Sequence, residues 1–174
     1  ENDYGSVAFW YQTGKPTYKA RAPHARERAL PNIERTVVYA RDFKDAKQHG
    51  AGSVTAQPLD LYPGEQLLYQ ATQSDGSWLE IPFEVKTKEP LRLLLNVTQA
   101  DDFGRYQAHL DGTKVGGVMD FFNTKIVSKE FHLLDFWPEP GTHTLRLECV
   151  GKHAQSAGFY CGIESVRLRE RRPR

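Results

Sequence analysis

The sequence predicts an all-β protein built as an antiparallel β-sandwich, and three observations support this. Short strand-like runs recur from residue 35 onward, turn signals such as PGE, SDG, LDGTK and EPGTH fall between them, and several runs alternate apolar and polar residues. Regularly spaced short strands separated by turn signals are typical of all-β sandwiches. With 174 residues, of which 39% are hydrophobic, the chain can bury a core.

The expected strands of the body follow one another with short connections. In chain order they are residues 35–40, 65–72, 77–85, 90–98, 105–110, 114–120, 125–132, 142–150 and 158–168. Upstream, residues 1–12 contain the apolar run VAFWY and are predicted to form a further strand. Residues 13–34 are rich in Pro, Lys, Arg and Ala without a sustained period, which predicts an extended connector, with a helix around residues 24–30 as the alternative.

The alternation of apolar and polar residues assigns side chains to the two faces of each strand, because successive side chains point to opposite sides. The expected core residues are Leu79, Ile81, Phe83, Val85, Leu91, Leu93, Leu95, Val97, Leu145, Leu147 and Cys149. In the last strand the apolar positions shift by one after Ile163, which predicts a β-bulge near Glu164 and Ser165. Asp111 and Gly112 predict a tight hairpin turn, since both residue types tolerate a positive φ.

Charge and hydropathy exclude two classes of function. The net charge is +1, which is unlike a nucleic-acid-binding protein. The basic residues between 167 and 174 are interpreted as a solvated end, with 171–174 as a basic tail. No apolar run approaches the roughly 20 residues of a membrane-spanning helix, so neither a nucleic-acid nor a membrane partner is expected.

Metal and nucleophile motifs are weak. Cys149 and Cys161 lie on consecutive predicted strands, and a turn centred near Gln155 would place them opposite each other, which leaves open either a cross-strand disulfide or two buried free thiols. Asp101 and Asp102 could contribute to a calcium site or belong to a polar loop. The six histidines lack zinc-ligand spacing, and no GxSxG or phosphate-binding loop is present, so no cofactor is predicted.

Sugar recognition is the best positive interpretation of the body. Trp78 is predicted to point away from the core with Glu80 on the same face, and Phe103 and Tyr106 are expected to flank Arg105 near the Asp101–Asp102 loop. Phe103, Tyr106 and Tyr160 are further aromatic candidates. Outward aromatics beside carboxylate and guanidinium groups suit sugar binding, although they suit a protein interface as well. The candidate ligand-binding residues of the body are Trp78, Glu80 and Arg105.

Two segments resemble a known family. NDYGSVAFWYQ, residues 2–12, resembles the strand NDYSSVAYWYQ near the end of the catalytic region of glycoside hydrolase family 172, formerly domain of unknown function 2961, with Gly5 and Phe9 as departures. Most of residues 35–170, including DFGRYQAHLDGTKVGG and GTHTLRLECVGK, resembles the jelly-roll modules, similar to carbohydrate-binding modules, that follow such catalytic regions in many bacterial proteins.

The resemblance implies a division of the chain and a set of partners. Residues 1–34 would hold the closing strand of an upstream catalytic jelly roll plus a linker, and residues 35–170 an accessory jelly-roll β-sandwich. The catalytic glutamates would lie upstream, so no catalytic residue is expected here. The resemblance implies that Glu1 and Asp3 line the rim of that upstream site and that Trp10 or Tyr11 forms a sugar platform, with burial in a jelly-roll core as the alternative for the aromatics.

Three functions remain open at this stage. The first is the C-terminal accessory part of a hydrolase acting on furanoside-containing carbohydrates, inactive alone, with an upstream catalytic segment or polypeptide and an oligo- or polysaccharide as partners. The second is a stand-alone carbohydrate-binding module. The third is a structural subunit that pairs its N-terminal strand with another chain. The resemblance also implies a homo-oligomer and a secreted or periplasmic location.

Overall fold

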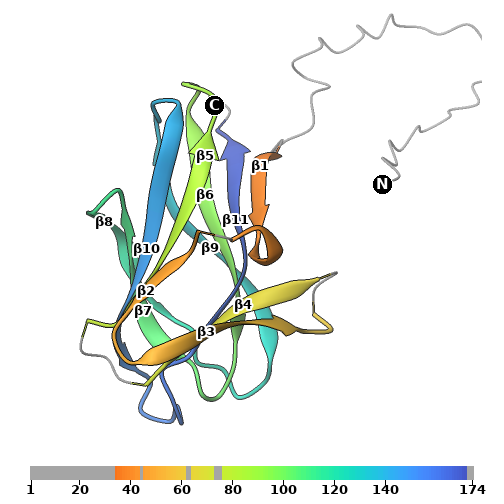
Figure 1. Cartoon of the computed structure of the whole chain (residues 1–174), viewed down its shortest axis with the longest axis vertical. Helices are drawn as coiled ribbons and strands as arrows, with labels where there is room; N and C mark the ends of the chain where they lie inside the picture. Colours follow the sequence, from red (N-terminus) through yellow and green to blue (C-terminus); the bar gives the residue numbers. More distant parts are fainter. Residues whose placement is uncertain (1–33, 44, 62–63, 73–75, 172–174) are drawn as a thin grey trace, which may run out of the picture. The chain divides into compact units, whose positions relative to one another are not determined.

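A computed structural model of the chain describes residues 34–43, 45–61, 64–72 and 76–171, all within the compact unit Pro31–Arg174 (Figure 1). The elements in chain order are β1 (Glu34–Tyr39), the 3-10 helix η1 (Ala40–Asp42), β2 (Lys47–His49), β3 (Gly52–Pro58), β4 (Glu65–Ala71), β5 (Trp78–Val85), β6 (Leu91–Gln99), β7 (Gly104–Leu110), β8 (Thr113–Asp120), β9 (Val127–Phe136), β10 (Gly141–Lys152) and β11 (Cys161–Glu170).

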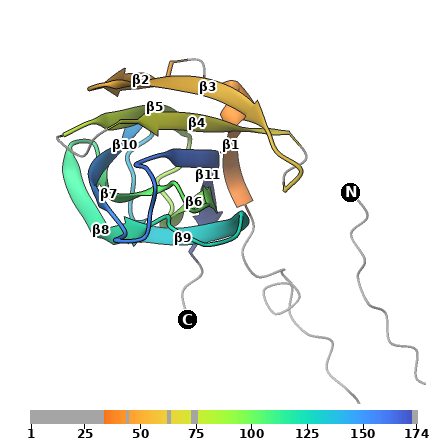
Figure 2. The same ribbon diagram turned by 90° about the horizontal axis from the view of Figure 1, so that it is seen from below.

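The strands form two antiparallel sheets that face each other (Figure 2). Sheet A has the order β3-β4-β11-β6-β9, and β1 also pairs with β11. Sheet B has the order β2-β5-β10-β7-β8. The prediction of an all-β antiparallel sandwich is therefore confirmed. The described residues contain no helix with the length and apolar character of a membrane span.

The core lies between the two sheets and consists of the alternating positions that the sequence indicated. All the expected core residues are buried, with Leu79, Ile81, Leu93, Leu95 and Leu147 fully inaccessible to solvent. Burying a leucine or isoleucine side chain stabilises the folded state by about 1.5 to 3 kcal/mol. The apolar period of two thus fixes which face of each strand is turned inward.

Two local irregularities also agree with the sequence. Asp111 and Gly112 have φ angles of 48° and 80°, so the β7–β8 hairpin uses the left-handed conformations expected of a tight turn. The pairing of β11 with β6 shifts between Ile163 and Ser165. This is the predicted β-bulge, and it returns Val166 and Leu168 to the core side.

Several boundaries differ from the prediction. β2 and β3 were not expected, because the segment KQHGAGSVTAQP offers little apolar alternation and its strands are almost wholly exposed. β9 continues to Phe136, and the last strand begins at Cys161. The first strand starts at Glu34, one residue before the expected boundary.

The two cysteines are free and buried, and they do not face each other on paired strands. Cys149 lies on β10 in sheet B, whereas Cys161 lies on β11 in sheet A, because the chain crosses between the sheets at residues 153–160. Burial raises the pKa of the Cys161 thiol well above its ordinary value. The expectation that the β10–β11 turn places the cysteines opposite each other in one hairpin is wrong.

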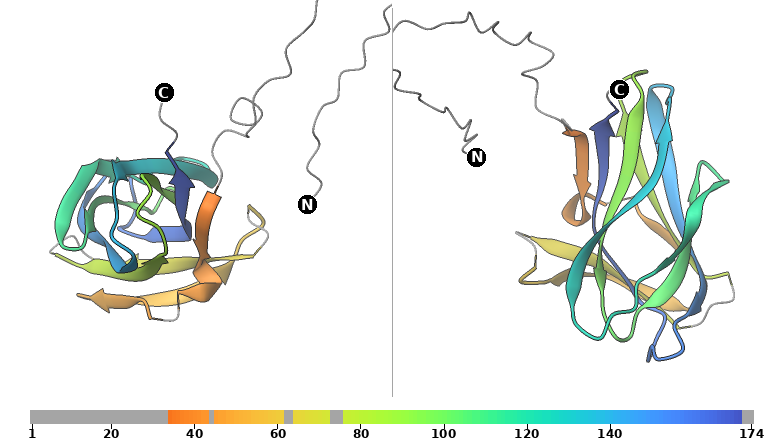
Figure 3. Two further views of the ribbon diagram at one scale, coloured as in Figure 1. Left: turned by 90° about the horizontal axis from the view of Figure 1, so that it is seen from above. Right: turned by 180° about the vertical axis from the view of Figure 1, so that it is seen from behind.

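The remaining expectations fall on other parts of the chain. The strand at residues 1–12, the connector at 13–33 and most of the basic tail lie outside the described residues. Figure 3 shows the described sandwich from above and from behind, with β1 and the end of β11 side by side. The chain therefore enters and leaves the sandwich at the same end.

Truncating a core side chain should lower the free energy of unfolding far more than truncating a surface side chain of the same strand. We expect Leu147→Ala to lower the free energy of unfolding by about 2 to 5 kcal/mol, because it leaves a cavity between the sheets. Val150→Ala, on β10 but 44% exposed, should change it by less than about 0.5 kcal/mol. Urea denaturation measures both, and equal losses would contradict the assigned faces.

Stability should also depend on His143. Burial by itself lowers the pKa of this ring, but the Glu139 carbonyl at 2.8 Å and the Asp111 carboxylate at 2.6 Å accept its two N–H groups, with Glu84 nearby, and together they raise the pKa above its ordinary value. The protonated His143 ring therefore stabilises the folded state. This contribution is fully present below the unfolded pKa of about 6.5, and it is lost as pH rises through the higher pKa of the folded state.

The test compares the pH dependence of unfolding in wild type and His143→Gln. Wild type should lose stability relative to the variant as pH rises from about 6.5 toward the folded pKa. A difference between the two proteins that stays constant over this range would show that the His143 proton is not linked to folding.

Candidate functional site

The outer face of sheet B carries a row of charged and aromatic side chains. The alternation of side chains along β5 and β10 determines this row. The core positions point inward, namely Leu79, Ile81, Leu145 and Leu147. The residues between them therefore point outward. Pairing then sets their neighbours. Glu80 lies opposite Arg146, which lies opposite His109, while Trp78 lies opposite Glu148 and Glu148 opposite Gln107.

Trp78, Glu80 and Arg146 form one cluster, which we call the Trp78 cluster. The Arg146 Nη2 and Nε atoms donate to Glu80 Oε2 at 2.9 and 3.0 Å. The Arg146 guanidinium carbon lies 4.5 Å from the centre of the Trp78 ring, a cation–π contact. His49 of β2 stacks on the same ring with centroids 5.6 Å apart. Because β2 and β10 lie on opposite sides of β5, Trp78 is flanked by an imidazole and a guanidinium.

Beside this cluster, β7 and β10 contribute a second polar group. His109 Nε2 lies 3.2 Å from Glu148 Oε2, within ion-pair distance when the ring is protonated, although the two atoms make no hydrogen bond. Gln107 is 3% exposed and donates to the Val115 carbonyl at 2.8 Å, but its Oε1 atom has no partner among the described residues. Two buried side-chain atoms, His109 Nε2 and Gln107 Oε1, thus have no hydrogen-bond partner among the described residues.

Arg105 is on the same face but outside the Trp78 cluster. Its Nε atom donates to Asp120 Oδ2 at 2.8 Å, and Asp120 also accepts from the Phe122 backbone N–H. In the sheet, Arg105 pairs with Gly151, beyond Glu148, whereas Trp78 pairs with Glu148. The structure therefore brings Trp78 and Glu80 together and places Arg105 at the far side of the same surface.

Two of the other aromatic candidates are not available to a ligand. Phe103 is 4% exposed and Tyr106 is fully buried, stacking on Phe121 in the core. The expectation that they flank Arg105 on the surface is wrong, because in β7 Tyr106 occupies an inward position. Tyr160 is half-buried and bridges to the backbone of Phe103. Asp3, Trp10 and Tyr11 lie outside the described residues.

A calcium site at Asp101 and Asp102 finds no support in the geometry. Within the described ranges, no group of three or more His, Cys, Asp or Glu side chains is placed to hold a metal ion. Burial raises the pKa of the Asp102 carboxyl, its own backbone N–H lowers it, and the neighbouring Asp101 charge raises it again, with a net rise. A backbone hydrogen bond holds the Asp101–Asp102 loop, because Tyr160 N donates to Asp102 O at 3.1 Å.

Several residues of the outer face were not singled out from the sequence. Arg146 and Glu148 had a readable signal, because they alternate with the leucines of LRLEC and must point outward. His109 follows the same logic in RYQAHL. His49 had no such signal, because the strand that carries it was not predicted.

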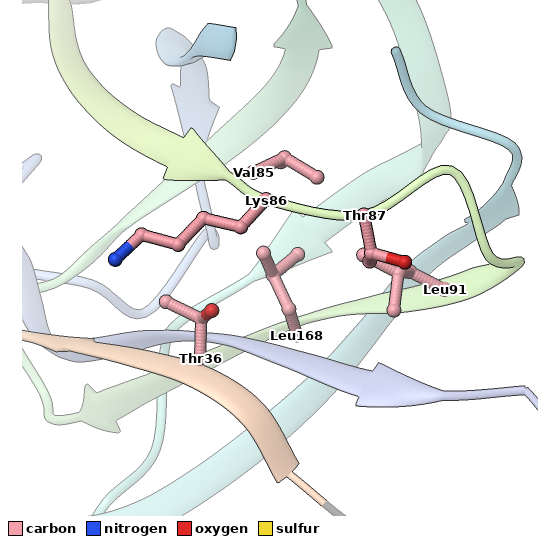
Figure 4. Close-up of a pocket in the computed structure, with 6 residues that line it drawn as sticks. All are labelled: Thr36, Val85, Lys86, Thr87, Leu91 and Leu168. Carbon is pink, nitrogen blue, oxygen red and sulfur yellow. The ribbon is translucent and has the colours of Figure 1, made fainter. Parts of the chain in front are cut away.

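A cavity of about 220 Å³ lies at the other end of β5 from Trp78 (Figure 4). It is lined by Thr36, Val85, Lys86, Thr87, Leu91 and Leu168. Its lining combines three apolar side chains with two hydroxyls and one ammonium. This cavity is separate from the Trp78 cluster, which lies on the open outer face of sheet B.

Comparison with known proteins identifies the fold. No protein-family model matches the chain, and no curated protein matches it. Several solved structures, in contrast, match the chain. A xanthan lyase from Paenibacillus matches with a TM-score of 0.67 and 21% identity over 80% of this chain. A family 35 carbohydrate-binding module from Clostridium thermocellum matches with a TM-score of 0.53 and 16% identity, covering 77% of this chain and 98% of the module.

A family 6 carbohydrate-binding module from Cellvibrio mixtus lichenase 5A, solved with cellotriose, matches with a TM-score of 0.51 and 12% identity, over 80% of this chain and all of the module. The chain corresponds to only 14% of the lyase. At these identities the likeness establishes the fold, a jelly-roll β-sandwich of the kind found in carbohydrate-binding modules. Such domains occur both as separate modules and within larger polysaccharide-degrading enzymes.

Proposed function

We propose that the sandwich is a carbohydrate-binding domain and that the outer face of sheet B is its contact surface. The observation that carries this proposal is the Trp78 cluster, where an indole, a carboxylate and a guanidinium meet on a partly exposed face. The Glu80 side chain is 22% exposed and that of Arg146 is 38% exposed, so both remain accessible from solvent.

The chemistry of the cluster suits a sugar. The apolar face of a pyranose or furanose ring stacks on an indole, while ring hydroxyls donate to carboxylates and accept from guanidinium groups. Arg146 and His49 flank the Trp78 indole, so the proposal requires one of them to leave the ring when a sugar stacks there. A contact surface on a sheet face favours an extended polymer over a small buried ligand.

The solved neighbours support the same class of ligand and an enzyme context. The Cellvibrio mixtus module was solved with cellotriose, and a Podospora anserina mannanase carries a family 35 module that matches with a TM-score of 0.54 and 13% identity, over 80% of this chain and 28% of the enzyme. We therefore propose that the domain holds a polysaccharide near a catalytic domain of a hydrolase or lyase.

A finer version of the proposal rests on residues 1–12. Their likeness to the closing strand of family 172 enzymes favours an accessory role in a hydrolase acting on furanoside-containing carbohydrates, with residues 1–34 as strand and linker, 35–170 as the sandwich and 171–174 as a tail. A secreted or periplasmic location suits that role. The alternatives are a stand-alone binding module and a structural subunit that pairs its N-terminal strand with another chain.

Removing the indole should weaken polysaccharide binding. We expect Trp78→Ala to reduce affinity at least about tenfold, the scale of one lost aromatic stacking contact. Trp137→Ala is the matched control, because Trp137 is 67% exposed but lies in the β9–β10 connection, away from the cluster. Affinity electrophoresis against a panel of neutral and acidic polysaccharides measures both variants.

Equal retardation of wild type and Trp78→Ala on every retarding polysaccharide would refute the outer face of sheet B as the contact surface. No retardation of wild type on any polysaccharide would favour the structural role over the binding role.

The enzyme context is tested separately. The chain alone should release no sugar from arabino- or fructofuranoside oligosaccharides, and native mass spectrometry of the protein from its source should reveal a catalytic segment or polypeptide attached to it. Hydrolysis by the purified chain would contradict the proposed division of labour, and so would a source protein without any catalytic region.

A further inference from the structure

Strand β3 leaves one of its edges without a partner among the described residues. It pairs with β4 on one side and ends the strand order of sheet A on the other. All seven of its residues are exposed except Val54, which is half-buried. In Figures 2 and 3 β3 lies at the outermost side of the sandwich. The outward backbone groups of this edge therefore have no partner strand among the described residues.

This edge lacks the charges that protect other edges. Exposed edge strands are usually blunted by charged side chains, because a bare edge can pair with another chain. β2 carries Lys47, β8 carries Lys114 and Asp120, and β9 carries Lys129 and Glu130. β3 reads GSVTAQP and contains no charged residue.

Two observations show which backbone groups point to the free edge. Thr72 N donates to Ala51 O at 3.2 Å, and the antiparallel register places these residues opposite each other. Hydrogen-bonded and non-bonded pairs alternate along such a ladder. The backbone N–H and C=O groups of Ser53, Thr55 and Gln57 therefore bond to β4, whereas the backbone groups of Val54 and Ala56 point to the free edge. Pro58, which has no N–H to donate, falls at an outward position in the same alternation.

The side chains of β3 are partly committed to β4 as well. Ser53 Oγ donates to Gln70 Oε1 at 3.0 Å, and Gln57 Oε1 accepts from Gln66 Nε2 at 2.7 Å. Thr55, between them, makes no side-chain hydrogen bond within the described part of the chain. The centre of the free edge is thus uncharged, with an uncommitted hydroxyl.

We propose that two copies of this chain associate by pairing their β3 strands antiparallel about a two-fold axis at Thr55. In this register Val54 of one copy faces Ala56 of the other, and these are the residues whose N–H and C=O groups point outward. Ser53 faces Gln57, and Thr55 faces its own symmetry mate.

A second copy fits this edge for physical reasons. Small apolar residues meet each other, polar residues meet polar ones, and no like charges oppose across the axis. A Thr–Thr cross-strand pair is favourable on its own. The isologous contact also satisfies both copies at once and closes the assembly as a dimer rather than a fibre.

The test places charges on the proposed axis of the full chain. In sedimentation velocity experiments from about 1 to about 300 µM, wild type should form dimers, whereas Thr55→Lys and Thr55→Glu should each weaken self-association at least about tenfold, because like charges would meet at the axis. An equimolar mixture of the two variants should recover the dimer, since Lys would then face Glu. Thr113→Lys makes the same change on edge strand β8 and should leave the dimer intact.

A second variant probes the backbone. Ala56→Pro removes an N–H that points to the free edge and donates no hydrogen bond to β4, so the dimer should weaken at least about tenfold while the melting temperature of the monomer changes little. The proposal is overturned by a monomeric wild type over the whole concentration range, by a dimer that persists in the Thr55 variants, or by a mixture that fails to recover it. If Ala56→Pro does not fold, the charge-pair result decides.

Discussion

The burial of alternating side chains between two antiparallel sheets is the constraint on which the rest of the structure depends. Leu79 and Leu147 meet from neighbouring strands of sheet B, and Leu93 and Ile163 face them from sheet A, all fully buried. A shift of one residue in any of these strands would expose its whole apolar set. Because the inner positions are fixed in this way, the outer ones are fixed too, and the Trp78 cluster is a direct consequence of the core.

The charged side chains on the outer faces of the two sheets differ in their contacts. On sheet A, Asp135 accepts from Arg92 at 3.1 Å and from His132 at 2.8 Å, and it also pairs with Arg171. Burial raises the pKa of the Asp135 carboxyl, but the hydrogen bonds from Arg92 and His132 outweigh it and lower the pKa overall. The ions of this group are paired with one another, and Arg171 also lies 5.3 Å from the centre of the Trp137 ring.

On sheet B the corresponding groups are less complete. Arg146 divides its contacts between Glu80 and Trp78, and the aromatic ring lies within the polar row. Among the described residues, the buried atoms His109 Nε2 and Gln107 Oε1 have no hydrogen-bond partner, although buried polar groups are nearly always satisfied. The Trp78 cluster, together with the fold, is the basis of our proposal that sheet B binds carbohydrate.

The sequence by itself determined the fold class, nearly all of the strands from 65 to 170, the core, the Asp111–Gly112 turn and the bulge after Ile163, because all of these depend on local periodicity and turn chemistry. It also determined that Trp78 and Glu80 share an outward face. Only the tertiary structure decided that Arg146 and His49 join Trp78, that Tyr106 is core, and that the cysteines lie in different sheets. Those relations depend on which strands pair across the fold, and strand order is set by the packing of distant segments that no local pattern records. β2 and β3 were not predicted for the same reason. Both are exposed edge strands, and pairing with a neighbouring strand stabilises them in place of an apolar pattern of their own.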